Sequence, residues 1–302
     1  MVEVGEGEEG QRIDNFLLRR APGVPKSHVY RIIRKGQVRV NGGRIKPTRK
    51  LVHGDIVRIP PMQLKKTGDV SVPDRLASSI AEAVVDERDD FLVLNKPPGL
   101  AVHAGSGLAF GAIDALRQAR KEPELELVHR LDRGTSGALL IARNAGVGRA
   151  MQGLFRNRQI KKFYLALLDG QWLAGDKTVN VPLAKNKEHA GERRVMVSAD
   201  GQSAVSHFSC QAQFNDASLM RIEIETGRTH QIRVHSKHCG HPVVGDTRYG
   251  SNSNNAAFKR RGLNRLFLHS ESMQFDWQGE FVEVRAKPGA DWEQAQKELG
   301  NG

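Results

Sequence analysis

The stretch His129-Arg130-Leu131-Asp132-Arg133-Gly134-Thr135-Ser136-Gly137 carries the strongest indication of fold and function in this sequence. Apolar runs precede it at 125–128 and follow it at 138–142. The pattern therefore predicts a loop between two buried strands. The glycines, threonine and serine of the stretch suit tight turns and bonds from side chain to backbone.

This loop holds a single carboxylate, Asp132, between Arg130 and Arg133. Two cations near a carboxylate favour its ionised form, which a nucleophile or an electrostatic stabiliser requires. The structural alternative is an aspartate that fixes the loop through salt bridges, because ion pairs of that kind cluster in the same way. The spacing alone is compatible with both interpretations.

The composition is typical of a soluble globular protein. Of the 302 residues, 39% are hydrophobic and 26% are charged, and no apolar run approaches the roughly 18 residues of a membrane span. The first residues are acidic and lack a hydrophobic signal region. The only cysteines, Cys210 and Cys239, form no C-x-x-C pair, which indicates a reduced compartment. We expect a cytoplasmic protein without membrane association, and a monomer.

The charge distribution indicates an anionic polymer as the partner. The net charge is +12 and the isoelectric point is near 9.9. Residues 1–62 hold 13 Lys or Arg against 6 Asp or Glu, an excess of +7, and four of those acids lie in the first nine residues. The alternative, a generically basic protein, does not explain why the excess is concentrated in this segment.

Residues 10–62 predict a small basic domain. Apolar residues recur at helical spacing in two short segments, and alternation predicts strands after them. Exposed lysines and arginines lie between the apolar positions. The predicted elements are helices at 11–17 and 25–35 with Gly36 at the end of the second, strands at 38–40 and 56–59, and a hairpin turn at Asn41-Gly42.

Two further boundaries follow from composition. Residues 63–82 have little periodic apolar content, so we expect a linker that leaves the small domain free to move. A large domain then spans 83–290, and the charged residues 291–302 form a tail that we expect to be frayed. The glycines at 103–107 lack the Gly-Lys-Ser/Thr ending of a phosphate-binding loop, so nucleotide binding is not expected there.

Within the large domain, a strand over 162–167 contains Tyr164, one of three tyrosines in the chain. A tyrosine in a strand is most often a packing residue. Residues 180–200 are basic, and either an RNA-gripping loop or a solvated hairpin fits them. The other predicted elements are a strand at 91–94, a helix at 147–158, strands at 204–212, 218–225 and 281–284, and a basic loop at 259–261.

The second marked motif is Thr226-Gly227-Arg228-Thr229-His230-Gln231-Ile232-Arg233-Val234-His235. Thr229 is expected to cap a helix that ends at Gly240. Four histidines and Cys239 in this region suggest a zinc site, but their spacing does not bring four ligands together. We therefore do not expect a metal.

Several motifs together resemble the RluA-type pseudouridine synthases. The similar strings, in the family's order, are Asn95-Lys-Pro-x-Gly99, His129-Arg-Leu-Asp-Arg-x-Thr-Ser-Gly137, Lys162-x-Tyr-x-Ala166, Gly227-Arg-x-His-Gln-Ile-Arg-x-His235, Gly245–Gly250 and Arg265–Ser270. The resemblance spans about residues 10–290. It implies an α+β catalytic domain with a mixed, mainly antiparallel sheet. It also implies that no cofactor is required, because the reaction has no redox step and no net hydrolysis.

The N-terminal segment resembles the S4 RNA-binding domain. The residues that carry this resemblance include Arg12, Lys26, Arg31 and Lys35, together with Ser27, Gly36, Val38, Val40, Asn41 and Gly42. Cations along one face would contact phosphates and confer affinity with little sequence selectivity. The alternative is a basic helical cap without a ligand.

The resemblance assigns roles to five residues of the large domain. Asp132 is implied to be catalytic, Arg233 to pair with it, and Tyr164 to line the active site. Arg130 is implied to enter the space that a flipped-out uridine leaves, and Leu268 to pack on the base. The implied substrates are uridines of 23S ribosomal RNA, either free or in an assembling large-subunit particle.

Two other classes of function compete with this interpretation. A non-catalytic RNA chaperone would explain the charge and the S4-like segment, but not the coincidence of Asp132, Tyr164 and Arg233 with motif positions. A glycosidic hydrolase normally needs two carboxylates at a set separation, and no second motif carboxylate is evident. A metal nuclease would need a cluster of acidic or histidine ligands.

Overall fold

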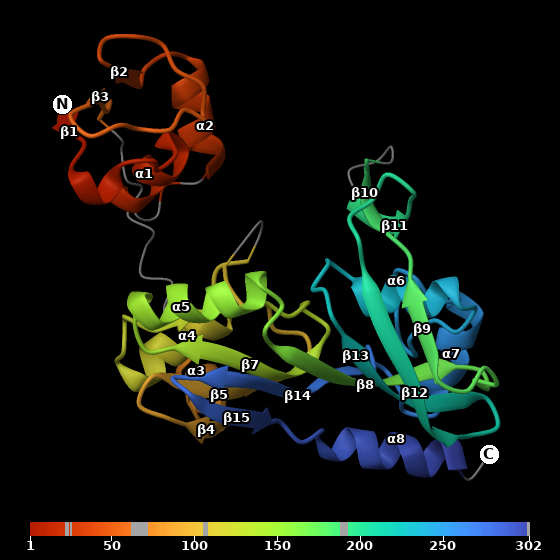
Figure 1. Ribbon diagram of the computed structural model, residues 1–302. Helices are drawn as coiled ribbons and strands as arrows, with labels where there is room; N and C mark the ends of the chain where they lie inside the picture. The colour runs from red at the N-terminus through yellow and green to blue at the C-terminus, as the bar shows by residue number, and fades with distance from the viewer. Residues whose placement is uncertain (22–23, 25, 62–71, 105–107, 188–192, 301–302) are drawn as a thin grey trace. The chain divides into compact units, whose positions relative to one another are not determined.

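The computed structural model describes the chain except for residues 22–23, 25, 62–71, 105–107, 188–192 and 301–302. The chain divides into two compact units, Met1–Ser71 and Val72–Gly302, each described by itself below (Figure 1). Among the described residues, no helix combines the length and the apolar character that a membrane crossing requires.

The N-terminal unit packs two helices against a three-stranded antiparallel sheet in the order β1-β3-β2. Phe16 and Leu17 of the first helix and Ile32 and Ile33 of the second meet Val57 in one buried cluster. The expected turn is present, since Asn41 and Gly42 both have positive φ. The elements are β1 (Val2–Glu3), a 3-10 turn (Glu6–Glu8), α1 (Ile13–Arg20), α2 (Lys26–Arg34), β2 (Arg39–Val40) and β3 (Ile56–Arg58).

The C-terminal unit is built on a ten-stranded sheet in the order β4-β5-β7-β14-β8-β13-β12-β9, with β6 paired to β7 and β15 paired to β14. Only β7 and β14 pair in parallel among the described strands, which confirms the mixed, mainly antiparallel sheet. The strands are β4 (Val84–Glu87), β5 (Phe91–Lys96), β6 (Glu126–Leu127), β7 (Ser136–Ala142), β8 (Lys161–Asp169), β9 (Lys177–Asn180), β12 (Val205–Gln213), β13 (Ala217–Ile224), β14 (Leu268–Trp277) and β15 (Glu280–Arg285).

One half of this sheet, which includes β5 and β7, is covered by helices on both faces. Leu94 and Leu139 share a cluster with α3 and α4, whereas Val93 and Leu140 pack with Met151 of α5. Strands buried on both faces are apolar throughout rather than alternating, as β7 is. The helices are α3 (Asp74–Glu82), α4 (Ala112–Arg120), α5 (Ala145–Arg156), α6 (Gln231–His238), α7 (Asn252–Arg260) and α8 (Ala290–Gly300).

Gly137 permits the central parallel pair. Ser270 lies opposite Gly137, and a Cβ on Gly137 would lie 2.2 Å from the Ser270 carbonyl oxygen. The φ of Gly137 is +107°, a conformation that residues with a side chain rarely adopt. The glycine therefore lets the end of the motif stretch pack directly against β14. On its opposite edge β14 pairs with β8, the strand that carries Tyr164.

The expected linker and tail are both wrong in part. Residues 74–82 of the 63–82 linker form α3, whose Ala77 and Ile80 are buried, and residues 63–71 lie outside the described residues. The expected frayed tail is instead α8, with Trp292 and Leu299 packed against Phe267. Both short helices place apolar residues three or four positions apart, a stripe too narrow to be evident in the sequence.

Other boundaries also differ from the expectation. The large unit begins at Val72 rather than at residue 83. The expected basic loop at 259–261 lies at the end of α7. Residues 180–200 contain the antiparallel hairpin of β10 (Leu183–Lys187) and β11 (Arg193–Val197), while 188–192 lie outside the described residues.

Candidate active site

The motif loop is held by the segment that follows β5. Gly99 donates its backbone N–H to the Arg133 carbonyl at 2.8 Å, and Arg133 Nε donates to the Gly99 carbonyl at 2.7 Å. Within the loop, the Thr135 N–H donates to the Asp132 carbonyl. The position of the Asp132 backbone is therefore set by contacts on both sides.

Lys96 connects the same two segments from inside the fold. Its side chain is fully buried, and its Nζ donates to the carbonyls of Pro97 and Leu100 at 2.8 Å and of Arg133 at 3.3 Å. Burial lowers the pKa of Lys96 to about 7, although the negative charge of Asp132 acts in the opposite direction. Three carbonyl acceptors match the three hydrogens of the ammonium group.

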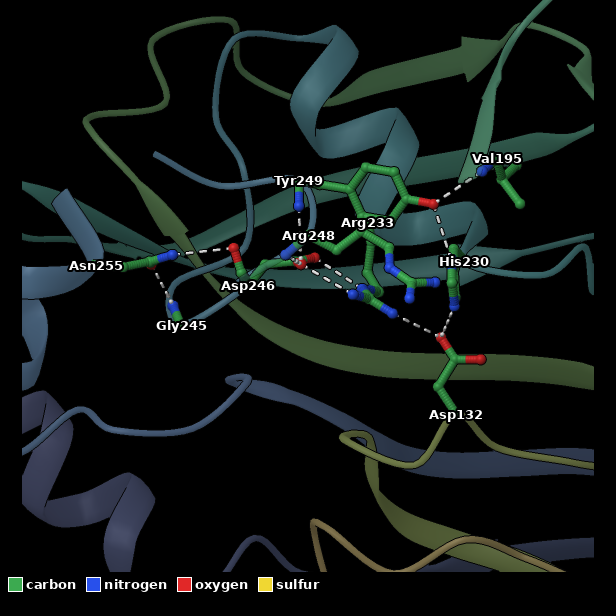
Figure 2. A network of polar contacts seen from close by, with 9 residues as sticks. All are labelled: Asp132, Val195, His230, Arg233, Gly245, Asp246, Arg248, Tyr249 and Asn255. Atoms are coloured by element: carbon green, nitrogen blue, oxygen red, sulfur yellow. Dashed lines mark hydrogen bonds and ion pairs between the residues drawn. The ribbon is translucent and has the colours of Figure 1, made fainter. Parts of the chain in front are cut away.

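Arg233 joins two carboxylates (Figure 2). Its Nη1 lies 3.3 Å from Asp132 Oδ2, while Nε and Nη2 form a bidentate pair with Asp246 at 2.7 and 2.9 Å. Asp246 is fully buried and also accepts the backbone N–H groups of Arg248 and Tyr249. Burial raises the pKa of Asp246, but the bonds and charge of Arg233 lower it by more, so the net shift is downward. Asp246 therefore fixes the guanidinium that meets Asp132.

A second chain of contacts reaches the same Asp132 oxygen. His230 Nε2 lies 3.7 Å from Asp132 Oδ2, and His230 Nδ1 lies 2.8 Å from the Tyr249 hydroxyl (Figure 2). The Val195 N–H donates to the same hydroxyl oxygen, and because the Asp132 carboxylate can only accept, a hydrogen on Nε2 is favoured with the Tyr249 hydroxyl donating to Nδ1. His230 then carries its own hydrogen on Nε2, facing Asp132.

The residue at the start of α6 is not the expected one. His230, with φ of +55°, occupies the N-cap position, and Thr229 is exposed. Thr226 and Gln231 stabilise the turn instead, because the Gln231 amide oxygen accepts the Thr226 hydroxyl and the Arg228 N–H. The left-handed conformation of His230 places its ring toward Asp132.

The pocket next to Asp132 is lined by Tyr164 of β8 and Leu268 of β14, with Arg130 at its edge. Burial raises the pKa of Tyr164 to about 12, and the charge of Asp132 acts in the same direction. Leu268 belongs to an apolar cluster with Ile232 and Ile224. The pocket thus combines one carboxylate with a cationic, polar side and an apolar side that includes Tyr164 and Leu268.

The remaining histidines do not converge on a metal. His235 contacts Ser206 Oγ and the Val181 carbonyl, and His241 contacts the Asp169 carbonyl. Among the residues that the structure describes, no group of three or more His, Cys, Asp or Glu side chains is close enough together to hold a metal ion.

His129, the first residue of the motif, lies beneath the loop. Its Nε2 accepts the Leu140 N–H at 2.9 Å, and its ring stacks on Phe155 at 4.6 Å between centroids. Burial lowers the pKa of His129 to about 3, and the charge of Lys162 acts in the same direction. A neutral ring is required because the acceptor nitrogen cannot also carry a proton.

This burial predicts a pH dependence of stability. The unfolded chain binds a proton on His129 below about pH 6.5 and the folded chain only near pH 3, so stability falls as the pH drops between these values. Between pH 6.5 and 4, the free energy of unfolding of His129→Gln should depend less steeply on pH than that of the wild type. The difference between the two slopes should be about 1 kcal/mol per pH unit. Urea titrations at several pH values measure this slope. Equal slopes in both proteins would contradict a buried neutral His129.

The candidate RNA-binding residues of the N-terminal unit differ in environment. Arg31 and Lys35 are exposed, and the Lys26 side chain lies outside the described residues. Arg12 is bound to the buried Asp14 at 2.7 Å, and Asp14 also accepts the Tyr30 hydroxyl. Arg12 thus also holds the start of α1, which was not predicted.

The structure brings Asp132, Arg233, Tyr164, Leu268 and Arg130 around one pocket, as their motifs suggested. Sequence reasoning missed four further residues there or beside it, although each lies in a quoted motif. The sequence signal that could have identified them is a polar or ionisable residue at a fixed place inside a quoted motif. They are Lys96, His230, Asp246 and Tyr249.

The fold and the pocket define a two-unit RNA-modifying enzyme of the pseudouridine synthase class. The sequence profile of the RNA pseudouridylate synthase family matches residues 90–238, and the profile of the S4 domain matches residues 11–57. The chain belongs to the RNA pseudouridylate synthase family, with an S4 domain at its N-terminus.

The similar proteins agree with this assignment. Ribosomal large subunit pseudouridine synthase C of Yersinia pestis is 47% identical over 91% of this chain and 87% of its own length. The protein of that name from Escherichia coli is 47% identical over 92% and 89%. Among solved structures, human RNA pseudouridylate synthase domain containing 1 is 27% identical, with a TM-score of 0.59 over 68% of this chain and 83% of that one.

Proposed function

We propose that this enzyme converts specific uridines of the large-subunit (23S) ribosomal RNA to pseudouridine. The observation that carries the proposal is a single motif carboxylate, Asp132, held by Arg233 in a pocket that also contains the Tyr164 ring and Leu268. The names of the similar proteins, which cover nine-tenths of the chain, supply the substrate class. The S4 unit supports an RNA substrate.

In this proposal Asp132 acts on the ribose of the target uridine. Its Oδ2 is occupied by Arg233 and approached by His230, whereas Oδ1 has no hydrogen-bond partner among the described residues. One oxygen is therefore available either to attack the sugar carbon or to remove a sugar proton. The bond from ribose to N1 breaks, the base turns, and C5 replaces N1 on the sugar. C5 loses a proton and N1 gains one, so the atoms balance without an oxidant, a reductant or net consumption of water.

Arg130 and Leu268 complete the substrate side of the proposal. Arg130 is exposed at the rim, where its guanidinium can enter the stack that the uridine leaves. Leu268 is buried in the wall and offers an apolar surface to the flat base. With RNA bound over the pocket, the detached uracil is kept from escaping.

Tyr164 is proposed to stack on the base and to relay the C5 proton: its oxygen takes this proton as the phenol proton passes to the Asp132 carboxylate released from the sugar, and N1 of the product gains a proton in return. We expect Tyr164→Phe to leave RNA affinity within about threefold, because the ring is kept, and to slow turnover about 10²-fold or more. Filter binding and single-turnover assays separate the two effects. Turnover at the wild-type rate would reduce Tyr164 to a packing residue.

The N-terminal unit is proposed to hold the RNA through Arg12, Lys26, Arg31 and Lys35. Deletion of residues 1–71 is expected to weaken binding of 23S RNA about tenfold or more at physiological salt. The rate of pseudouridine formation at saturating RNA should be retained. The cut lies before Val72, which is buried in the core of the large unit. No activity of the folded fragment at any RNA concentration would contradict this division.

The deciding experiment maps pseudouridine across ribosomal RNA from cells with the wild-type protein, without it, and with Asp132→Asn. We expect discrete sites in 23S RNA to vanish in both altered strains. If no site changes in either strain, the proposed function is wrong. Modification of free 23S RNA against pre-ribosomal particles in vitro identifies the preferred substrate. We also propose that the protein is a monomer, which analytical sedimentation tests, and that it is cytoplasmic, which cell fractionation tests.

A further inference from the structure

A second cavity lies beside the reaction pocket and is strongly basic. Its volume is about 410 Å³, and it shares Arg130, Tyr164 and Arg228 with the reaction pocket. Its wall adds three cations from the end of α5 and the start of β8, and its only acid is Glu225, whose carboxylate lies 2.9 Å from His207. The added cations are Arg156, Arg158 and Lys162.

Lys162 is a buried cation with an unused donor. Its side chain is 6% exposed, and its Nζ donates to the carbonyls of Ile160 at 3.0 Å and Glu225 at 3.3 Å. An ammonium group has three hydrogens, and the third has no acceptor among the described residues. A buried cation left short of an acceptor is costly. An anion in the cavity would supply the missing acceptor.

Arg158 occupies a position where glycine is the usual residue. Its φ is +60°, and the last turn of α5 closes with Arg158 N–H to the Phe155 carbonyl and Gln159 N–H to the Leu154 carbonyl. These bonds form the helix-ending turn in which a left-handed residue is needed. A side chain there carries a conformational cost that glycine avoids. The chain nevertheless places a guanidinium at this point on the cavity wall.

The cations of the outer wall are not neutralised within the fold. Among the described residues, Arg130, Arg156 and Arg158 form no ion pair, and the Arg228 guanidinium donates to the Ser203 carbonyl. His129 and Phe155 stack on each other, and Tyr164 belongs also to the wall of the reaction pocket, so the groups that this cavity adds are mainly cations. Guanidinium and ammonium donors around such a space suit phosphate oxygens.

We propose that this cavity binds a backbone phosphate of the RNA strand next to the target uridine. The proposal rests on the proposed function. Because the two cavities share Arg130, Tyr164 and Arg228, an RNA strand whose uridine enters the reaction pocket would have a neighbouring phosphate in the second cavity. Lys162 and Arg158 hold the phosphate oxygens, and this contact fixes the register in which the uridine enters the pocket. The contact carries no sequence information of its own.

Arg158→Gly tests the proposal, because binding and stability should respond differently. We expect the melting temperature to stay equal or to rise, since glycine suits the left-handed position. Affinity for unmodified 23S RNA, measured with Asp132→Asn as the parent, should fall about five- to tenfold. The slope of log K against log salt should become shallower by about 0.7.

Lys121→Gly is the matched control. Lys121 ends α4 with φ of +54°, is exposed and lies outside both cavities, so the change removes the same charge from the same backbone conformation. It should leave RNA affinity and the salt slope unchanged. Equal losses in Arg158→Gly and Lys121→Gly would overturn the phosphate site, because they would reflect net charge alone.

A chemical test locates the phosphate. Short RNAs that carry a mapped target uridine are made with one neutral methylphosphonate linkage at each flanking position. The Asp132→Asn protein should lose affinity at one linkage, and adding Arg158→Gly should abolish that difference. Uniform loss at all linkages would overturn the proposal while leaving pseudouridine formation intact. If Arg158→Gly weakened the binding of polyglutamate but left RNA affinity unchanged, the cavity would be a site for an acidic protein instead.

Discussion

Asp132→Asn is expected to reduce pseudouridine formation at least about 10⁴-fold. An amide keeps the size of the side chain and the loop contacts, but it can neither attack the sugar nor accept a proton. The Arg133 and Thr135 backbone bonds that hold the loop do not involve the carboxylate. RNA affinity should therefore stay within about threefold of wild type. Single-turnover assays on unmodified 23S RNA, together with filter binding, measure both quantities.

The control for this change is Asp276→Asn on β14, an exposed aspartate outside the pocket. It should retain full activity and binding. If RNA binding of Asp132→Asn collapsed together with activity, Asp132 would be a structural residue. That result would revive the salt-bridge interpretation of the motif loop.

Asp246→Asn is expected to reduce both stability and turnover strongly. The amide keeps one oxygen for the Arg248 and Tyr249 N–H groups but leaves the Arg233 guanidinium without its bidentate partner. A buried ion pair broken from one side costs about 3 kcal/mol or more. Since Arg233 also orients Asp132, turnover should fall about 10²-fold while KM changes little. Chemical denaturation and steady-state kinetics measure the two effects.

Glu271→Gln serves as the matched ion-pair control. Glu271 pairs with Arg221 at 2.9 Å, but both side chains are partly exposed. Such a pair contributes less than about 1 kcal/mol, and it lies outside the pocket. If Asp246→Asn were as stable and as active as Glu271→Gln, the Asp246–Arg233–Asp132 chain would have no role in positioning the carboxylate.

Some features of the fold were predictable because they depend on local pattern. The alternation over 204–212 and 218–225 corresponds to β12 and β13, and the periodicity over 147–158 to α5 with Asn144 as its cap. The short helices α3 and α8 were not predicted, since each is stabilised mainly by tertiary packing. Trp292 of α8 is buried in a cluster with Phe267 and other residues from distant segments of the chain.

The candidate site shows the same division. The motifs indicated Asp132, Tyr164 and Arg233, and the structure brings these residues together from β8, α6 and the motif loop. The partner of Arg233 could not be read from spacing, because Asp246 lies thirteen residues away in a loop. Neither could the left-handed His230, whose ring faces Asp132 because of its backbone conformation.

The sequence by itself determined the family of this protein, the motif residues and the regular strands, because these are set by residue type and short-range spacing. The tertiary structure alone decided which oxygen of Asp132 is occupied and which is available, and that Lys162 and Arg158 share a cavity with Arg130. The physical reason is that hydrogen bonds and burial depend on segments such as 129–137 and 230–246, which lie about a hundred residues apart in the chain.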